Sequence, residues 1–100
     1  MEVSDIVKKK YSDTEFLYVI DKLDNDDVIQ LHHEVEDIYE DCCDSLRKAI
    51  KEFKDTGIPK DPEWFHKCKR LANIRKRHLM MIQRELNMRN ITKDEVQNTR

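Results

Sequence analysis

Two long segments of the chain carry apolar residues at the three- and four-residue spacing of an amphipathic helix. The first predicted helix runs from about residue 26 to 54, and the second from about 62 to 89. Gly57 favours the left-handed conformation that ends a helix, and Pro59 prevents its continuation. Asp61 precedes Pro62 in the order typical of a helix start. The pattern therefore predicts two helices joined by a short linker.

Each predicted helix has a single core-facing stripe. The first stripe consists of Val28, Leu31, Val35, Ile38, Cys42, Leu46, Ala49 and Phe53, widened by Tyr39 and Ile50. The second stripe consists of Phe65, Cys68, Ala72, Leu79, Ile82 and Leu86, widened by Trp64 and Leu71. Two such helices joined by a short linker form an antiparallel hairpin.

A shorter helix is predicted in front of the hairpin, over about residues 13–23. Ser12 and Glu15 have the spacing of a capping box, and apolar residues follow at helical intervals. The ends of the chain, residues 1–11 and 91–100, are expected to be short helices or frayed tails. In these segments Ser4 is a candidate cap, and Thr92 and Glu95 repeat the capping-box spacing. The expected fold is one all-α domain over residues 1–100, a three-helix bundle or a coiled-coil-like hairpin.

The hairpin also predicts which residues face each other across its two arms. Folding the chain about residues 58–59 places Cys42 opposite Arg75 and Cys68 opposite Ala49. The two inward cysteines are then far apart, which argues against a disulfide between them. Arg75 is the one charged residue on the inner stripe of the second long helix, and an acid such as Asp41 is its expected partner.

Composition narrows the class of protein further. Charged residues make up 40% of the 100 residues, and the single glycine excludes glycine-rich phosphate-binding loops. The chain has no apolar run long enough for a membrane span or a signal peptide, and its three cysteines do not form the even set of a secreted disulfide framework. These features predict a cytoplasmic protein. Net charge is −8 over residues 1–57 and +6 over residues 58–100, so oppositely charged arms are expected to attract each other.

One face of the second long helix is a candidate partner-binding surface outside the core stripe. It carries two parallel ridges at seven-residue spacing, one basic and one apolar: Arg70, Arg77, Arg84, Ile74, Met81 and Met88. The shorter N-terminal helix could pack on the apolar ridge, or the ridge could bind a protein or a second copy of the chain. The arginines could instead neutralise nucleic-acid phosphates. A second candidate is the acidic face of the first long helix, which could imitate a phosphate array: Asp37, Glu40, Asp41 and Asp44.

No catalytic or metal-binding pattern is found. The "EVED" stretch resembles half of a paired-carboxylate magnesium site, but the facing helix offers only Glu63 and Glu85. The cysteines and histidines lack the spacing of a zinc site. The sequence therefore predicts a protein that is not an enzyme and that has no metal or cofactor.

The segment "DPEWFHKCKRLANIRKRHLMMIQREL" resembles the C-terminal helix of small, uncharacterised helical proteins encoded by phages. The resemblance is carried by an Asp-Pro-x-Trp-Phe start before a basic helix with a late Gln and Leu: Asp61, Pro62, Trp64, Phe65, Gln83 and Leu86. It implies a setting in which small proteins bind a host or defence protein and alter its activity. The leading hypothesis is therefore a non-enzymatic protein-binding module, such as an inhibitor of a host or anti-phage defence factor. The alternative is a nucleic-acid-binding protein that uses the basic helix.

Overall fold

The computed structural model describes residues 2–98, and predictions about residues 1, 99 and 100 lie outside this range. Helices are the only regular secondary structure among the described residues, which confirms the all-α fold class. The elements are α1 (Val3–Lys8), α2 (Asp13–Lys22), α3 (Asn25–Thr56), α4 (Pro62–Met88) and α5 (Lys93–Asn98). Helices α3 and α4 are the two predicted arms of the hairpin, and their bounds differ from the predicted ones by at most two residues.

The ends of the long helices follow the predicted local chemistry. Gly57 has a φ of 73° and donates its N–H to the Phe53 carbonyl at 2.8 Å, which closes the last turn of α3. The Asp61 carboxylate accepts the Glu63 N–H at 3.1 Å and caps α4, with Pro62 in the first helical position. The linker between the arms therefore has the position and conformation that the sequence predicts.

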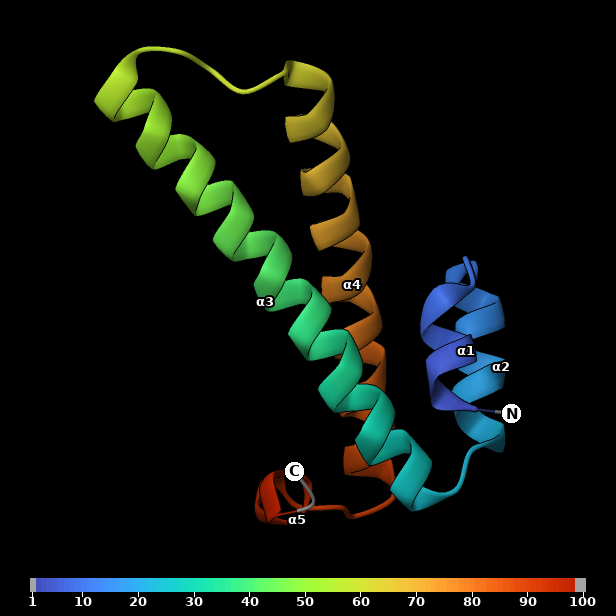
Figure 1. Ribbon diagram of the computed structural model, residues 1–100. Coiled ribbons are helices and arrows are strands. Elements are labelled where there is room, and N and C mark those ends of the chain that lie inside the picture. Colours follow the sequence, from blue (N-terminus) through green and yellow to red (C-terminus); the bar gives the residue numbers. More distant parts are fainter. Residues whose placement is uncertain (1, 99–100) are drawn as a thin grey trace.

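The two arms are packed at one end of the molecule and diverge toward the linker (Figure 1). The short helices gather at the packed end, where α1 lies on α3 and α2 lies on α4. Helix α5 lies across the same end (Figure 1). The structure extends 48 Å along its longest axis. We call the packed end the base, and the end that contains residues 46–71 the tip.

The buried core lies almost entirely in the base. Its largest fully buried side chains are Phe16, Ile6, Ile20, Leu31, Ile82, Val28 and Val35. They come from four of the five helices, so the short helices complete the core that the hairpin begins. A small chain has limited apolar surface to bury, and the described residues concentrate that burial in one half of the hairpin.

Both terminal segments are helical where the structure describes them. Val3 and Ile6 of α1 are buried against the core, as are Ile91 and Val96 around α5. Thr92 accepts the Glu95 N–H through its hydroxyl at 3.2 Å, which confirms the capping residue predicted there. The prediction that Ser4 caps the first helix was wrong, because α1 begins one residue earlier at Val3.

The predicted partner of Arg75 was also wrong. Arg75 donates through Nη2 to the Val7 carbonyl at 3.0 Å, in the last turn of α1, rather than to Asp41. A guanidinium suits this position because the last carbonyls of a helix lack partners within the helix. Burial lowers the pKa of Arg75 from its usual value. Arg75 therefore ties the first helix of the chain to α4.

The prediction that Cys42 and Cys68 lie far apart fails as well. The Cys68 Sγ lies 3.7 Å from the Cys42 carbonyl oxygen, and both thiols are free. Cys42 lies close enough to both Cys68 and Arg75 for each to affect its pKa. A uniform pairing about the linker assumes parallel arms, whereas the arms of this hairpin diverge (Figure 1). The cysteine pair joins α3 and α4 beyond the core cluster of the base.

No helix within residues 2–98 combines the length and apolar character that crossing a membrane requires.

Candidate functional site

The predicted ridge on α4 is divided by its contacts. Arg70 and Arg84 are exposed, but the Arg77 Nε lies 3.4 Å from a carboxylate oxygen of Asp13 at the start of α2. A negative charge in the first turn of a helix is already favourable there, so Arg77 adds an interhelical ion pair to that position. Because both side chains of this ion pair are exposed to solvent, the pair contributes little to the stability of the fold.

The apolar half of this ridge is divided in the same way. Ile74 and Met81 are partly buried, and Met81 packs against the core to which α2 contributes Phe16 and Ile20. Met88 is 78% exposed near the end of α4. The six predicted residues therefore do not form one continuous open surface. What is left is a shallow basic depression of about 550 Å³, lined by His66, Lys69, Arg70, Asn73, Ile74 and Arg77.

The predicted acidic face of α3 is exposed along its whole length. All four of its residues are exposed: Asp37, Glu40, Asp41 and Asp44. Asp44 lies 3.0 Å from Arg47 one turn further on. A series of carboxylates on a solvated helix face is common and does not by itself identify a partner.

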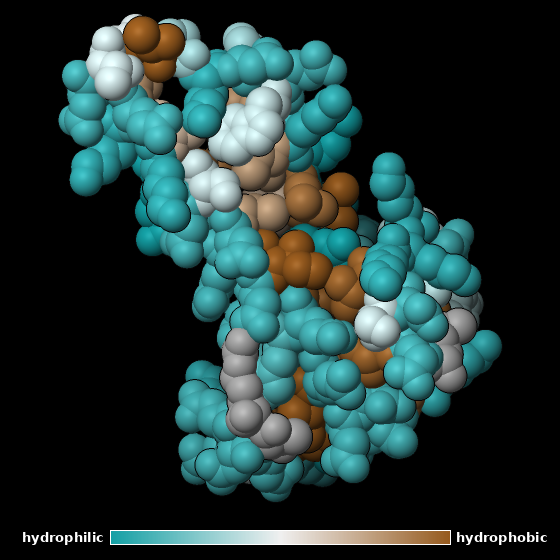
Figure 2. All heavy atoms as spheres, in the orientation of Figure 1, coloured by the Kyte–Doolittle hydropathy of each residue, from teal (hydrophilic) through white to brown (hydrophobic). Residues whose placement is uncertain are grey.

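The tip contains the largest departure from the predicted packing. Residues that the sequence assigns to the core stripes are exposed here: Ile50 is 44%, Phe53 49% and Leu71 39% accessible. Ile58, in the linker, is 73% accessible. In Figure 2, apolar side chains continue from the middle of the molecule into the space between the diverging arms.

Ile50 and Phe53 line an apolar groove of about 280 Å³, which we call the tip groove. It is lined by Ala49, Ile50, Phe53, Pro59, Lys60, Pro62, Phe65 and His66. Ala49 is buried and Phe65 partly buried, whereas Ile50 and Phe53 are open to solvent. Residues from both arms and from the linker therefore contribute to one concave apolar surface.

The tip carries a net positive charge. Residues 46–71 contain eight Lys and Arg against four Asp and Glu. The Lys60 ammonium lies 5.7 Å from the centre of the Trp64 ring, and the Lys69 ammonium lies 5.7 Å from the centre of the Phe65 ring. Cations at this distance from an aromatic face are attracted by its quadrupole. The groove thus combines an apolar interior with a cationic margin.

One feature of the sequence indicates the tip groove, although the assignment of residues to core stripes by helical spacing does not use it. Three aromatic residues, Phe53, Trp64 and Phe65, lie within four residues of the linker, together with Ile58 in the linker itself. Periodicity assigns such residues to a core, because it cannot tell a stripe that is covered from one that is not.

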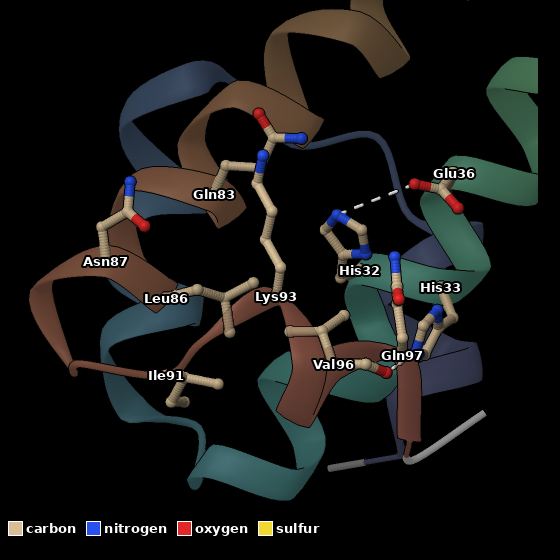
Figure 3. A pocket seen from close by; sticks show the side chains of 10 residues that line it. All are labelled: His32, His33, Glu36, Gln83, Leu86, Asn87, Ile91, Lys93, Val96 and Gln97. Carbon is tan, nitrogen blue, oxygen red and sulfur yellow. Dashed lines mark hydrogen bonds and ion pairs between the residues drawn. The ribbon is translucent and has the colours of Figure 1, made fainter.

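A second cavity, of about 420 Å³, lies in the base between α3, α4 and α5 (Figure 3). It is more polar than the tip groove, since His32, His33, Glu36, Lys93 and Gln97 line it together with apolar residues. His33 Nε2 donates to the Val96 carbonyl at 2.7 Å, and His32 Nε2 lies 3.9 Å from Glu36. The first contact ties α5 to α3, which gives His33 a structural role. Within residues 2–98, no group of three or more His, Cys, Asp or Glu side chains is placed to hold a metal ion.

His78 is a buried histidine of the base whose pKa is shifted. Its side chain is buried and stacked on Phe16, with ring centres 4.0 Å apart and planes 10° apart. Neither ring nitrogen has a hydrogen-bond partner among the described residues. Burial lowers the pKa of His78 below its usual value, and the nearby Arg75 lowers it further. His78 is thus a neutral ring in the packing between α2 and α4.

Comparisons with family models, with curated proteins and with solved structures found no match to this chain. The resemblance of α4 to helices of small phage proteins accordingly stays a prediction. The case for a function rests on the surfaces described above, and the tip groove is the most distinctive of them.

Proposed function

We propose that this protein is a non-enzymatic protein-binding module that contacts its partner through the tip groove. The observation that carries the proposal is the exposure of Ile50 and Phe53 in one apolar groove, next to the exposed Ile58 of the linker. Single exposed apolar residues are ordinary, but adjoining ones that form a groove are typical of a binding site. Leaving apolar area in water forgoes about 25 cal/mol per Å².

The contrast with the base supports this proposal. The same stripes that are exposed at the tip are covered at the base by α1 and α2, so the chain does contain segments that can cover a stripe. Phe53 and Trp64 also belong to the aromatic type that is enriched in binding interfaces. A partner that covered the tip would remove from water the apolar surface that the chain itself leaves open.

The proposal is tested with the double variant Ile50→Glu/Phe53→Glu. The matched control is Leu17→Glu/Tyr18→Glu, which changes two exposed apolar residues of α2 at the other end of the molecule. Each tagged protein is used to capture partners from extracts of the native host. Captured proteins are identified by mass spectrometry, purified and titrated by calorimetry.

We expect the tip variant to lose its partner and the control to keep it, while both retain the helical circular dichroism spectrum of the parent. A partner that binds the tip variant as tightly as the parent would show that the tip groove is not the contact surface. The ridge residues Arg70, Arg77 and Arg84 would then be the next to reverse, followed by Asp37, Glu40 and Asp44.

A nucleic-acid-binding protein is the second candidate, and the shallow basic depression on α4 favours it. Arg70 is exposed there beside Lys69, and both could neutralise phosphates. Phosphate contacts release counterions, so such binding weakens steeply as salt rises, whereas an apolar contact changes little. Titration of duplex DNA and of single-stranded RNA at several salt concentrations separates the two candidates. The more specific role, inhibition of a host or anti-phage defence factor, is supported by the resemblance of α4 alone.

A further inference from the structure

The shape of the tip groove is that of a space left by a missing helix. Its two sides are the diverging ends of α3 and α4, with Ala49 buried and Phe65 partly buried between them. At the base, the corresponding faces of the same two helices are covered by other helices (Figure 1). An apolar groove between two helices suits the apolar face of a third, which is a recurring mode of peptide recognition.

The length of the groove limits the size of such a helix. On α3 the groove is lined from Ala49 to Phe53, or roughly 6 Å at about 1.5 Å per residue. That span takes a little over one turn of a partner helix, which places its anchoring residues at positions i and i+3 or i+4.

The charge of the margin selects among helices. Two of the four acids at the tip are already paired, since Glu52 lies 3.8 Å from Lys60 and Glu63 lies 3.3 Å from Lys67. A third, Asp61, caps α4 by accepting the Glu63 N–H. These pairs engage Lys60 and Lys67 as well, but the tip as a whole keeps eight bases against four acids, a net charge of +4 that attracts carboxylates and repels cations.

The same charge argues against a second copy of the chain. Two tips brought together would place two regions of net charge +4 against each other. Like-charge juxtaposition disfavours association. A lipid surface fits less well too, because the apolar residues around Ala49 and Phe65 line a concavity rather than a protrusion.

We infer that the tip groove receives a short amphipathic α-helix with acidic flanks, supplied by another protein. The inference rests on the proposed function and adds the chemistry of the partner. The apolar face of the helix would lie against Phe53 and Phe65. Its carboxylates would lie near Lys60, which lines the groove, and Lys69, which lies over Phe65.

The experiment uses a displayed library of random peptides selected against the full chain, with counter-selection against the Phe53→Glu variant. Trp64 is the only tryptophan of the chain and lies next to the groove residue Phe65, so its fluorescence reports binding of a tryptophan-free peptide. The Leu17→Glu variant serves as the surface control. Circular dichroism first establishes that all variants keep the parent's helical content and melting curve.

We expect the enriched peptides to share apolar residues at i and at i+3 or i+4, with an excess of Asp and Glu beside them. The best of them should shift the Trp64 emission. It should bind at least about tenfold more weakly when its Glu residues are changed to Gln, or when the protein carries Lys60→Glu and Lys69→Glu, since close charge pairs at interfaces are often worth a factor of ten or more. The Leu17→Glu variant should bind it as the parent does.

Three outcomes would overturn the inference. The first leaves protein binding at the tip in place, and the other two replace the proposed helix with a second copy of the chain or with a membrane surface. Enriched peptides that depend on Phe53 but lack helical spacing or acidic flanks would leave the proposed function and refute the helix. Self-association in sedimentation velocity that Phe53→Glu abolishes would make a second copy the occupant. Phe53-dependent binding to phosphatidylserine vesicles would make it a membrane surface.

Two results together would refute the inference alone. The selection would yield no peptide whose binding depends on Phe53, and the parent would still capture a host partner that the tip variant loses. If capture by the tip variant is also unchanged, the proposed function fails with it.

Discussion

The two ends of one helical hairpin show how a single sequence pattern leads to two different environments. At the base, Leu31 and Val35 of α3 are fully buried, whereas at the tip Ile50 and Phe53 of the same helix are close to half exposed. All four residues belong to one stripe at helical spacing. The difference lies in what surrounds the stripe: α1, α2 and α5 gather at the base, and within residues 2–98 no further helix lies at the tip (Figure 1). A helix stripe therefore identifies an apolar face, and the rest of the chain decides whether that face becomes core or binding surface.

The two ends also differ in charge. The base, residues 2–45 and 72–98, contains seventeen acids and ten bases, whereas the tip, residues 46–71, contains four acids and eight bases. At the base, Arg75 and Arg77 of α4 and Arg89 just after it contact α1 and α2, where Arg89 donates to the Ile20 carbonyl at 3.1 Å. These three arginines therefore hold the short helices in place. At the tip, Lys60 and Lys67 pair with acids of the tip itself, and the bases outnumber the acids. The same residue type has a structural role at one end and remains available for a partner at the other.

The largest expected difference between the ends is in stability. Leu31→Ala should lower the free energy of unfolding by about 2–5 kcal/mol, because it removes a fully buried side chain and leaves a cavity. Phe53→Ala should lower it much less, since about half of that side chain is already in water. Urea titrations followed by circular dichroism measure both. Equal losses would mean that the tip is packed in solution as tightly as the base.

A cross-link at the boundary between the ends should have the next largest effect. Diamide should oxidise Cys42 and Cys68 to an intramolecular disulfide, with the two thiol hydrogens transferred to diamide. Burial raises the pKa of the Cys42 thiol, and the neighbouring Cys68 raises it further, so the reaction should need a mildly alkaline buffer. The closed loop should stabilise the fold by about 3 kcal/mol.

Mass spectrometry and thermal melting measure the product and its stability. Cys43→Ala should cross-link like the parent, because Cys43 points to a different side of α3, whereas Cys68→Ala should not. The parent could instead fail to cross-link under conditions that oxidise short peptides containing the same cysteines. This result would show that α3 and α4 are already separated at the level of Cys42 and Cys68.

A smaller effect is expected from pH at the base. Because burial holds the pKa of His78 below the usual 6.5, the unfolded chain takes up this proton first as the pH falls. Stability from this group is complete above about pH 6.5 and is lost below it, at no more than about 1.4 kcal/mol per pH unit for one proton. Replacing His78 with Phe keeps a ring beside Phe16 and removes the titration. The difference between the two stability profiles from pH 8 to pH 5 isolates the effect, and parallel profiles would contradict it.

The smallest effect is expected on the surface of α4. Reversing Arg70 and Arg84 to Glu should change stability by no more than about 0.5 kcal/mol each, because both side chains are exposed. Reversing Arg77 breaks the exposed pair with Asp13 and should cost only slightly more. Thermal melts of the three single variants check this. A loss of several kcal/mol in the Arg70 variant would show that the shallow depression on α4 is part of the fold.

The sequence by itself determined the local structure of this protein. Capping chemistry at Ser12, Asp61 and Thr92, and the Gly57 C-cap, set the ends of the helices, because such interactions involve residues within one turn of each other. Helical periodicity likewise identified the two long arms and the buried residues of the base, such as Val28 and Leu86.

Only the tertiary structure decided how the arms lie and what covers them. The angle between α3 and α4 brings Cys68 beside Cys42, and the position of α1 gives Arg75 a carbonyl partner in place of an acid. The predicted ridge on α4 was partly covered for the same reason, since α2 and its Asp13 reach Arg77. The tip groove exists because all three short helices pack at the base, where they bury Phe16, Ile6 and Val96 together. Such contacts join residues far apart in the chain, and their geometry depends on the packing of whole helices, which no local pattern records.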